Sequence, residues 1–270
     1  MYPSNRLLTR VLESDIIPYH LSPPPGEKII ILAPHPDDET LGCGGTIRLL
    51  RKSGKQVKVI FLTSGDQADP SNPASKIYHG EEHITDYSMM REREASKALK
   101  ILDVSDYVFL RFPDRKLDMY YESVLGRLLD VIKEYAADTI FSPSMIELNP
   151  DHRTTAALAM EIQRRGENVA PVPISLLFYE VATPLRPNIL IDISSTRKIK
   201  RKAVKAYGSQ LRLTPYLKCA AALNEIRTLT VPHARAVEAF WIAESPLDAE
   251  EITRWLAYQP SVSKSPHRAS

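Results

Sequence analysis

The sequence contains little cysteine and no long apolar run. Its 270 residues include two cysteines, Cys43 and Cys219, too few for a disulfide framework, and no Cys-x-x-Cys pair typical of structural zinc sites. No apolar run approaches the roughly 18 residues that a membrane-spanning helix needs. The first residues lack the apolar core and cleavage site of a secretory signal peptide. We therefore expect a cytoplasmic protein without a membrane span.

The chain also lacks an excess of charge of either sign. Thirty-five Lys and Arg residues stand against 33 Asp and Glu residues, for a formal net charge of +2. Nucleic-acid-binding domains usually carry a strong positive excess, so we expect no nucleic-acid partner. Hydrophobic residues make up 43% of the chain and charged residues 25%. This composition is ordinary for a globular protein and excludes a wholly disordered or fibrous chain.

Composition divides the chain into three parts. Residues 1–27 form a Pro-rich lead-in that ends in the run Ser-Pro-Pro-Pro-Gly, in which the prolines favour extended backbone. Residues 28–258 are predicted to form a single α/β domain with C-terminal additions. Residues 259–270 are rich in Ser and Pro and are expected to form a flexible tail.

Within residues 28–258, short apolar runs alternate with longer amphipathic segments. The runs are β-branched and aromatic, which is typical of strands buried on both faces. Strands are expected at Lys28–Ala33, Lys58–Thr63, Tyr107–Phe112, Thr139–Ser142, Ile174–Val181 and Ile189–Ile193. Helices are expected at Thr40–Lys52, Met89–Leu102, Tyr121–Tyr135, Thr154–Arg165, Thr196–Leu211 and Ala234–Ile242. The alternation predicts a Rossmann-like layered α/β fold, with a mostly parallel central sheet flanked by helices.

Two polar clusters follow predicted strands. His35, Asp37 and Asp38 come directly after the first strand, and Asn149 and His152 follow the strand at 139–142. Because ligands bind at the carboxyl ends of strands in open α/β sheets, both clusters are expected at one rim. Imidazole and carboxylate are ligands that zinc accepts, and a catalytic zinc needs about three of them. These residues predict a metal site with a His/Asp/His ligand set. The spacing alone does not show whether Asp37 or Asp38 is the ligand. Divalent metals other than zinc also suit this ligand set.

The stretches APHPDDETLGCGG and PDHR resemble the two signatures of the PIG-L/LmbE-like zinc-dependent N-deacetylases. Thr63-Ser64-Gly65, the Arg91-Glu92-Arg93-Glu94 helix start and a late helix containing Tyr207-Gly208-Ser209-Gln210 are also similar to that family. The resemblance covers roughly residues 28–240. It implies a hydrolase that removes the N-acetyl group from an N-acetylglucosamine-type sugar or sugar conjugate and releases acetate.

The resemblance also implies roles for individual residues. His35, Asp38 and His152 would be the zinc ligands, and Asp37 would be the general base for attack of zinc-bound water. Arg91 could hold a substrate oxygen or phosphate, and Asp114, which follows the third strand, could bind sugar hydroxyls. The roles of the three ligands, Asp37 and Arg91 are expectations from the family pattern, whereas that of Asp114 rests on its place at the carboxyl end of the third predicted strand.

The chain departs from the family at one position. The family's second motif usually reads His-x-x-His, and here Asn149 stands at the first His. An amide can donate a hydrogen bond to an oxyanion, but it cannot deliver a proton at neutral pH. The alternative function is therefore a catalytically weak or inactive zinc-containing module that binds amino sugars.

Other patterns favour simpler interpretations. The glycines of Gly42–Thr46 match no phosphate-binding loop, and close helix packing explains them better than nucleotide binding. His79 and His83 lack the Glu placement of a His-Glu-x-x-His site. The basic run Arg197–Lys205 is interpreted as a solvated helix face. Segment Asp66–Ser88 shows no clear period and could form a lid over the site.

Overall fold

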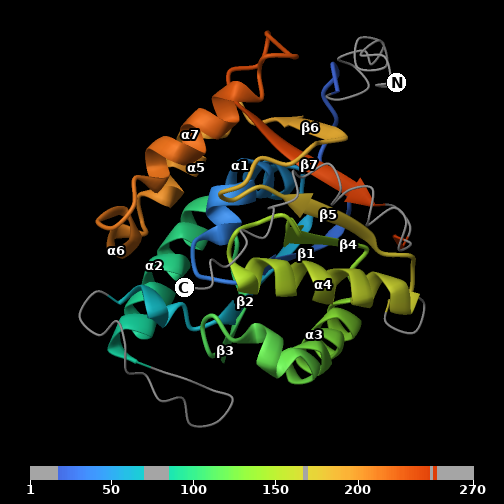
Figure 1. Ribbon diagram of the computed structural model, residues 1–270. Helices are drawn as coiled ribbons and strands as arrows, with labels where there is room; N and C mark the ends of the chain where they lie inside the picture. The colour runs from blue at the N-terminus through green and yellow to red at the C-terminus, as the bar shows by residue number, and fades with distance from the viewer. Residues whose placement is uncertain (1–17, 70–84, 167–169, 244–245, 248–270) are drawn as a thin grey trace, which may run out of the picture.

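The computed structural model describes residues 18–69, 85–166, 170–243 and 246–247. A seven-stranded sheet crosses this part of the chain, with helices packed on both faces (Figure 1). Its strands lie in the order β3-β2-β1-β4-β5-β7-β6. The strands are β1 (Lys28–Ala33), β2 (Gln56–Thr63), β3 (Asp106–Phe112), β4 (Thr139–Pro143), β5 (Ser175–Tyr179), β6 (Ile189–Asp192) and β7 (Val237–Ala243).

The sheet is mostly parallel. Strands β3, β2, β1, β4 and β5 pair in parallel, whereas β7 pairs antiparallel with both β5 and β6. The predicted fold class is confirmed. Chain order reverses between β1 and β4, and such reversals leave a crevice at the carboxyl ends of the strands where ligands bind.

Strand β1 shows why the apolar runs are continuous. Ile30 and Leu32 point into one core cluster, and Ile29, Ile31 and Ala33 point into the other. Helices α3 and α4 contribute to the first cluster, and α1, α2 and α5 contribute to the second. The helices are α1 (Asp38–Lys52), α2 (Asp86–Leu102), α3 (Tyr121–Tyr135), α4 (Pro150–Arg165), α5 (Arg197–Val204), α6 (Gly208–Leu211) and α7 (Tyr216–Ile226), with short 3-10 turns η3 (Asp66–Ala68) and η4 (Leu117–Tyr120).

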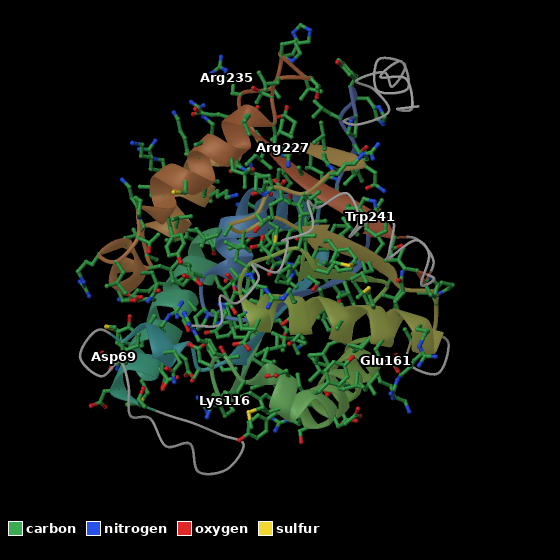
Figure 2. The ribbon with its side chains drawn as sticks, viewed as in Figure 1. Asp69, Lys116, Glu161, Arg227, Arg235 and Trp241 are labelled. Carbon is green, nitrogen blue, oxygen red and sulfur yellow. The ribbon has the colours of Figure 1, made fainter. Side chains whose placement is uncertain are left out.

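The prediction of a helix at Ala234–Ile242 is wrong, because most of this segment forms strand β7. It inserts between β5 and β6. The ring of Trp241, which is labelled in Figure 2, stacks on Phe178 of β5 with centroids 5.9 Å apart. A short apolar run fits a buried helix or a buried strand equally well, so distant partners decide. The predicted basic helix ends at Val204 and resumes as α6, and α7 was not predicted.

Several predictions fall on residues outside the described part. The tail at 259–270, the first 17 residues of the lead-in, His79, His83 and most of the proposed lid lie there. Within the described part, Cys43 is buried and Cys219 exposed, both as free thiols. No helix of this part is long and apolar enough to cross a membrane.

Helix α1 depends on glycine for close packing. A Cβ on Gly42 would lie 2.2 Å from the Tyr179 ring, which is fully buried and donates its hydroxyl to the Leu32 carbonyl. We expect Gly42→Ala to lower the free energy of unfolding by about 1–3 kcal/mol, the usual cost of overpacking. Gly126→Ala in α3 is the control, because nothing lies within 4 Å of its added Cβ. Denaturant unfolding should show this control unchanged or more stable; equal stability losses would contradict the packing argument.

Candidate active site

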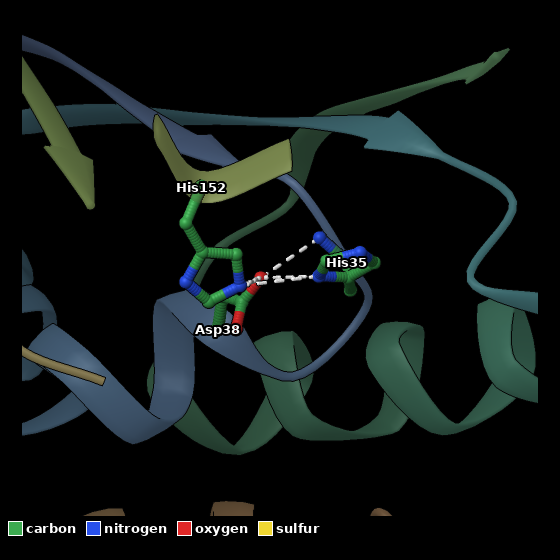
Figure 3. Close-up of side chains that lie close together, drawn as sticks. All are labelled: His35, Asp38 and His152. Atoms are coloured by element: carbon green, nitrogen blue, oxygen red, sulfur yellow. Dashed lines mark hydrogen bonds and ion pairs between the residues drawn. The ribbon is translucent and has the colours of Figure 1, made fainter. Parts of the chain in front are cut away.

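Three side chains converge at the carboxyl ends of β1 and β4 (Figure 3). His35 follows β1, Asp38 begins α1, and His152 lies in the first turn of α4. The Nδ1 atom of His35 lies 3.1 Å from Asp38 Oδ2 and 3.2 Å from His152 Nε2. His152 Nε2 lies 3.2 Å from the same Asp38 oxygen. The three potential ligand atoms thus form a nearly equilateral triangle, and all three side chains are buried.

This triangle fits a tetrahedral metal ion. Zinc–nitrogen and zinc–oxygen bonds of about 2.0–2.1 Å place neighbouring ligand atoms about 3.3–3.4 Å apart, close to the distances that separate these atoms. Two imidazole nitrogens facing each other beside one carboxylate oxygen repel through their lone pairs unless a proton or a metal cation lies among them. The donor set therefore suits zinc or a similar divalent cation.

A pair of carboxylates orients His35 from the other side of its ring. Its Nε2 lies 3.1 Å from Asp114 Oδ1 and 3.3 Å from Asp151 Oδ2. These acceptors favour the Nε2–H tautomer, which leaves Nδ1 free as a ligand. The three residues also form a second possible metal group. Backbone N–H groups of Gln67 and Arg115 already donate to the two carboxylates, so an orienting role accounts for them better.

The site electrostatics follow from these contacts. Burial would lower the pKa of His35, but Asp114 and its neighbours hold that pKa well above its ordinary value. Burial would raise the pKa of Asp114, but His35 and Arg91 lower it to about 2. For Asp38, the two histidines outweigh burial and lower its pKa. Asp38 and Asp114 are therefore ionised at neutral pH.

Asp37 lies beside the triangle and is held by Arg91. The Arg91 Nη2 atom is 3.1 Å from Asp37 Oδ1 and donates to the Pro36 carbonyl at 2.7 Å. Its Nη1 atom donates to the Gly65 carbonyl at 2.7 Å. Burial raises the pKa of Asp37 to about 6, against the lowering effect of Arg91. With φ at 152°, Asp37 also adopts a backbone conformation that is rare outside glycine, and such strain concentrates at functional sites.

A cavity of about 200 Å³ opens over these residues. Asn149 lines it from the N-terminus of α4, where its Oδ1 accepts a hydrogen bond from the Asp151 backbone N–H at 2.9 Å. This N-cap commits the amide oxygen and leaves the NH₂ group as the available donor. Leu148 also lines the cavity and is 79% exposed.

Arg91 and Asp114, which are predicted to bind substrate, both line this cavity. Both are buried, and their polar atoms face protein partners: Asp37 and backbone carbonyls for Arg91, His35 and a backbone N–H for Asp114. Sequence reasoning missed Asp151 and Glu147. Asp151 adjoins His152 in the PDHR motif, and this neighbourhood was the sequence signal that could have identified Asp151 as a site residue. Glu147, whose carboxylate lies 3.8 Å from His152 Nδ1, had none.

Comparison with known proteins agrees with this geometry. The family model PIG-L, described as GlcNAc-PI de-N-acetylase, matches residues 30–163, which include most of β1, all of β4 and the three converging side chains. Residues 30–163 belong to the PIG-L family.

Individual relatives extend this likeness along the chain. Diacetylchitobiose deacetylase of Thermococcus kodakarensis is 28% identical over 196 residues, which cover 68% of this chain and 70% of that protein. A probable N-acetyl-alpha-D-glucosaminyl L-malate deacetylase 2 of Bacillus subtilis is 24% identical and covers 68% of this chain and 83% of that protein. The crystal structure of the conserved Thermus thermophilus protein TT1542 superposes with a TM-score of 0.66 at 26% identity, over 82% of this chain and 96% of that one.

Proposed function

We propose that this PIG-L protein is a zinc-dependent amidohydrolase that removes the N-acetyl group from an N-acetylglucosamine-type sugar or sugar conjugate and releases acetate. The convergence of His35, Asp38 and His152 beside the separately held carboxylate of Asp37 carries the proposal. The names of the two deacetylase relatives support the substrate class.

His35 Nδ1, Asp38 Oδ2 and His152 Nε2 would hold the zinc ion. When bound, zinc polarises a carbonyl oxygen as a Lewis acid and makes water more acidic. Asp114 and Asp151 keep the His35 ring oriented through its Nε2–H. Outer partners of this kind fix ligand geometry and strengthen metal binding.

Asp37 is the proposed general base. Its carboxylate accepts a proton from the water that attacks the acetamide carbonyl, and then returns that proton to the amine nitrogen as the C–N bond breaks. Arg91 acts as a positioning residue, because it fixes Asp37 through Oδ1 and is itself anchored on two backbone carbonyls. The Asn149 NH₂ group donates to the oxyanion of the tetrahedral intermediate.

Acetate release tests the proposal. The zinc-loaded protein is incubated with N-acetylglucosamine, N,N'-diacetylchitobiose and glycosides of N-acetylglucosamine, with and without a chelator. We expect acetate from at least one compound and its loss with the chelator. Chelator-resistant release would overturn the role of the metal, and failure to release acetate from any of these amides would overturn the substrate class.

Asn149 also supports a second candidate, a zinc-containing amino-sugar-binding module, because an amide cannot act as an acid. We expect Asn149→His to raise the rate of acetate release by about 10-fold or more, since a positioned general acid contributes about 10²–10⁴-fold. Asn149→Ala is the control, because it removes the cap of α4 without adding an acid. Acetate from the His variant alone would favour the binding module, and equal rates in the parent and His variant would show that position 149 does not limit the reaction.

A further inference from the structure

A second cavity, of about 270 Å³, lies between helices α5 and α7. Its lining residues come from these helices and from the segments that lead into α5 and β7, and none of them lines the catalytic cavity. It is therefore a separate feature of the described part of the chain.

The rim of this cavity is strongly basic. Arg197, Lys198, Arg201 and Arg235 line it with exposed side chains, and Figure 2 labels Arg235, which lies beyond the upper end of α7. These four cations form no ion pair with the described residues. Glu225 is the one acidic residue in the lining. The excess of unpaired positive charge suits an anion, which guanidinium groups bind through paired N–H donors.

A fifth cation of the lining is already neutralised. Lys200 is buried, and its Nζ lies 2.6 Å from Glu238 Oε1. Glu238 also accepts hydrogen bonds from the backbone N–H groups of Gly45 and Thr46. This buried pair joins α5 to β7 and α1, and so fixes the position of α5 at the cavity. The cations of the rim are not part of this pair and can bind an anion.

The wall formed by α7 is apolar and incompletely packed. Asn224 is the only buried residue of this helix. Leu217, Ala220 and Ala221 line the cavity and are half-buried. Ile193, Val204 and Ala236 complete the apolar lining. Covering an apolar helix face with a ligand removes apolar surface from water, and this favours binding.

We propose that this cavity binds an amphipathic anion, a molecule with an alkyl or aryl body and a carboxylate or phosphate head. The body lies along Leu217, Ala220 and Ala221, and the head lies among Arg197, Arg201 and Arg235. The basic run of α5, interpreted from sequence as a solvated face, thus divides into cations that serve this site and cations such as Lys205 that do not line it. This proposal does not depend on the proposed deacetylase activity.

Calorimetric titration with decanoate, decyl phosphate, inorganic phosphate and decanol tests this site, with the two decyl anions kept below their micelle concentrations and decanol below its solubility limit. We expect both decyl anions to bind the full-length protein, and phosphate or decanol to bind at least about 10-fold more weakly, because each lacks one half of the recognition. A preference between the two decyl anions distinguishes a carboxylate from a phosphate head. The double variant Arg201→Glu/Arg235→Glu should weaken binding by about 10-fold or more.

Lys205→Glu is the matched control, because Lys205 is exposed directly after the last residue of α5 but does not line the cavity. Ala221→Trp fills the cavity without changing its charge and should also weaken binding, with folding checked by thermal melting. Equal affinity in the parent, the double variant and Ala221→Trp would overturn the proposal, as would absence of binding to either decyl anion. A change from dimer to monomer in the double variant, measured by light scattering, would instead identify an interface between copies and would also overturn it.

Discussion

Replacing Asp37 by asparagine is expected to lower the rate of acetate release by about 10²- to 10⁴-fold, the usual contribution of a positioned general base, while the protein retains its zinc. Asparagine preserves the size of the side chain but cannot accept a proton at neutral pH. Asp37 lies outside the triangle formed by His35, Asp38 and His152, so its loss should leave the metal ligands in place. Turnover and zinc content, measured on the same sample, check both parts of the prediction.

Asp118→Asn provides the matched control for this experiment. Asp118 is exposed in η4, and the same change of charge there should leave turnover unchanged. If Asp37→Asn kept near-normal turnover with zinc bound, another group would have to be the base. If the variant lost zinc as well, Asp37 would be a ligand and not a base.

Replacing His152 by alanine is expected to remove both zinc binding and acetate release. His152 Nε2 contributes one of the three potential ligand atoms, from a helix remote in sequence from the other two. The loss of affinity should exceed the roughly 10–100-fold that removal of an outer partner causes. Zinc should raise the melting temperature of the parent protein, because a ligand that binds the folded state stabilises it, but not that of His152→Ala.

Two further variants calibrate this result. His233→Ala removes an exposed histidine and should bind zinc as the parent does. Asp114→Asn keeps the three ligands but weakens the acceptor of the His35 Nε2–H, so its zinc affinity should fall between those of the parent and His152→Ala. Unchanged zinc affinity in His152→Ala would place the metal elsewhere, and the group formed by His35, Asp114 and Asp151 would then be the next candidate.

The first four strands could be predicted to within about two residues at each end, because the strands of a parallel sheet are covered on both faces and read as continuous apolar runs. The same pattern misled at Val237–Ala243. That segment is a strand because β5 and β6 flank it, and no local periodicity reports partners nearly 50 residues away. Helix α7 was missed although Leu217, Ala220 and Ala221 lie at helical spacing along the cavity, because the small alanines make only a weak apolar stripe.

In the candidate site, too, some features could be predicted from the sequence and others could not. His35 and His152 were paired from their placement after two strands, since strand ends of a parallel sheet share one edge. Which of the two aspartates faces the histidines depends on the backbone turn at Asp37, which the spacing does not encode. Arg91 and Asp114 both line the catalytic cavity, but their contacts with Asp37 and His35 depend on tertiary structure, which the sequence does not show.

The most direct test of the account is a titration of zinc into the metal-depleted protein with acetate release as the readout. The proposed site uses one imidazole–carboxylate–imidazole set, so release should be absent without metal, rise in proportion to added zinc and stop rising at one zinc per chain. Acetate release at full rate from the metal-depleted protein would contradict the account.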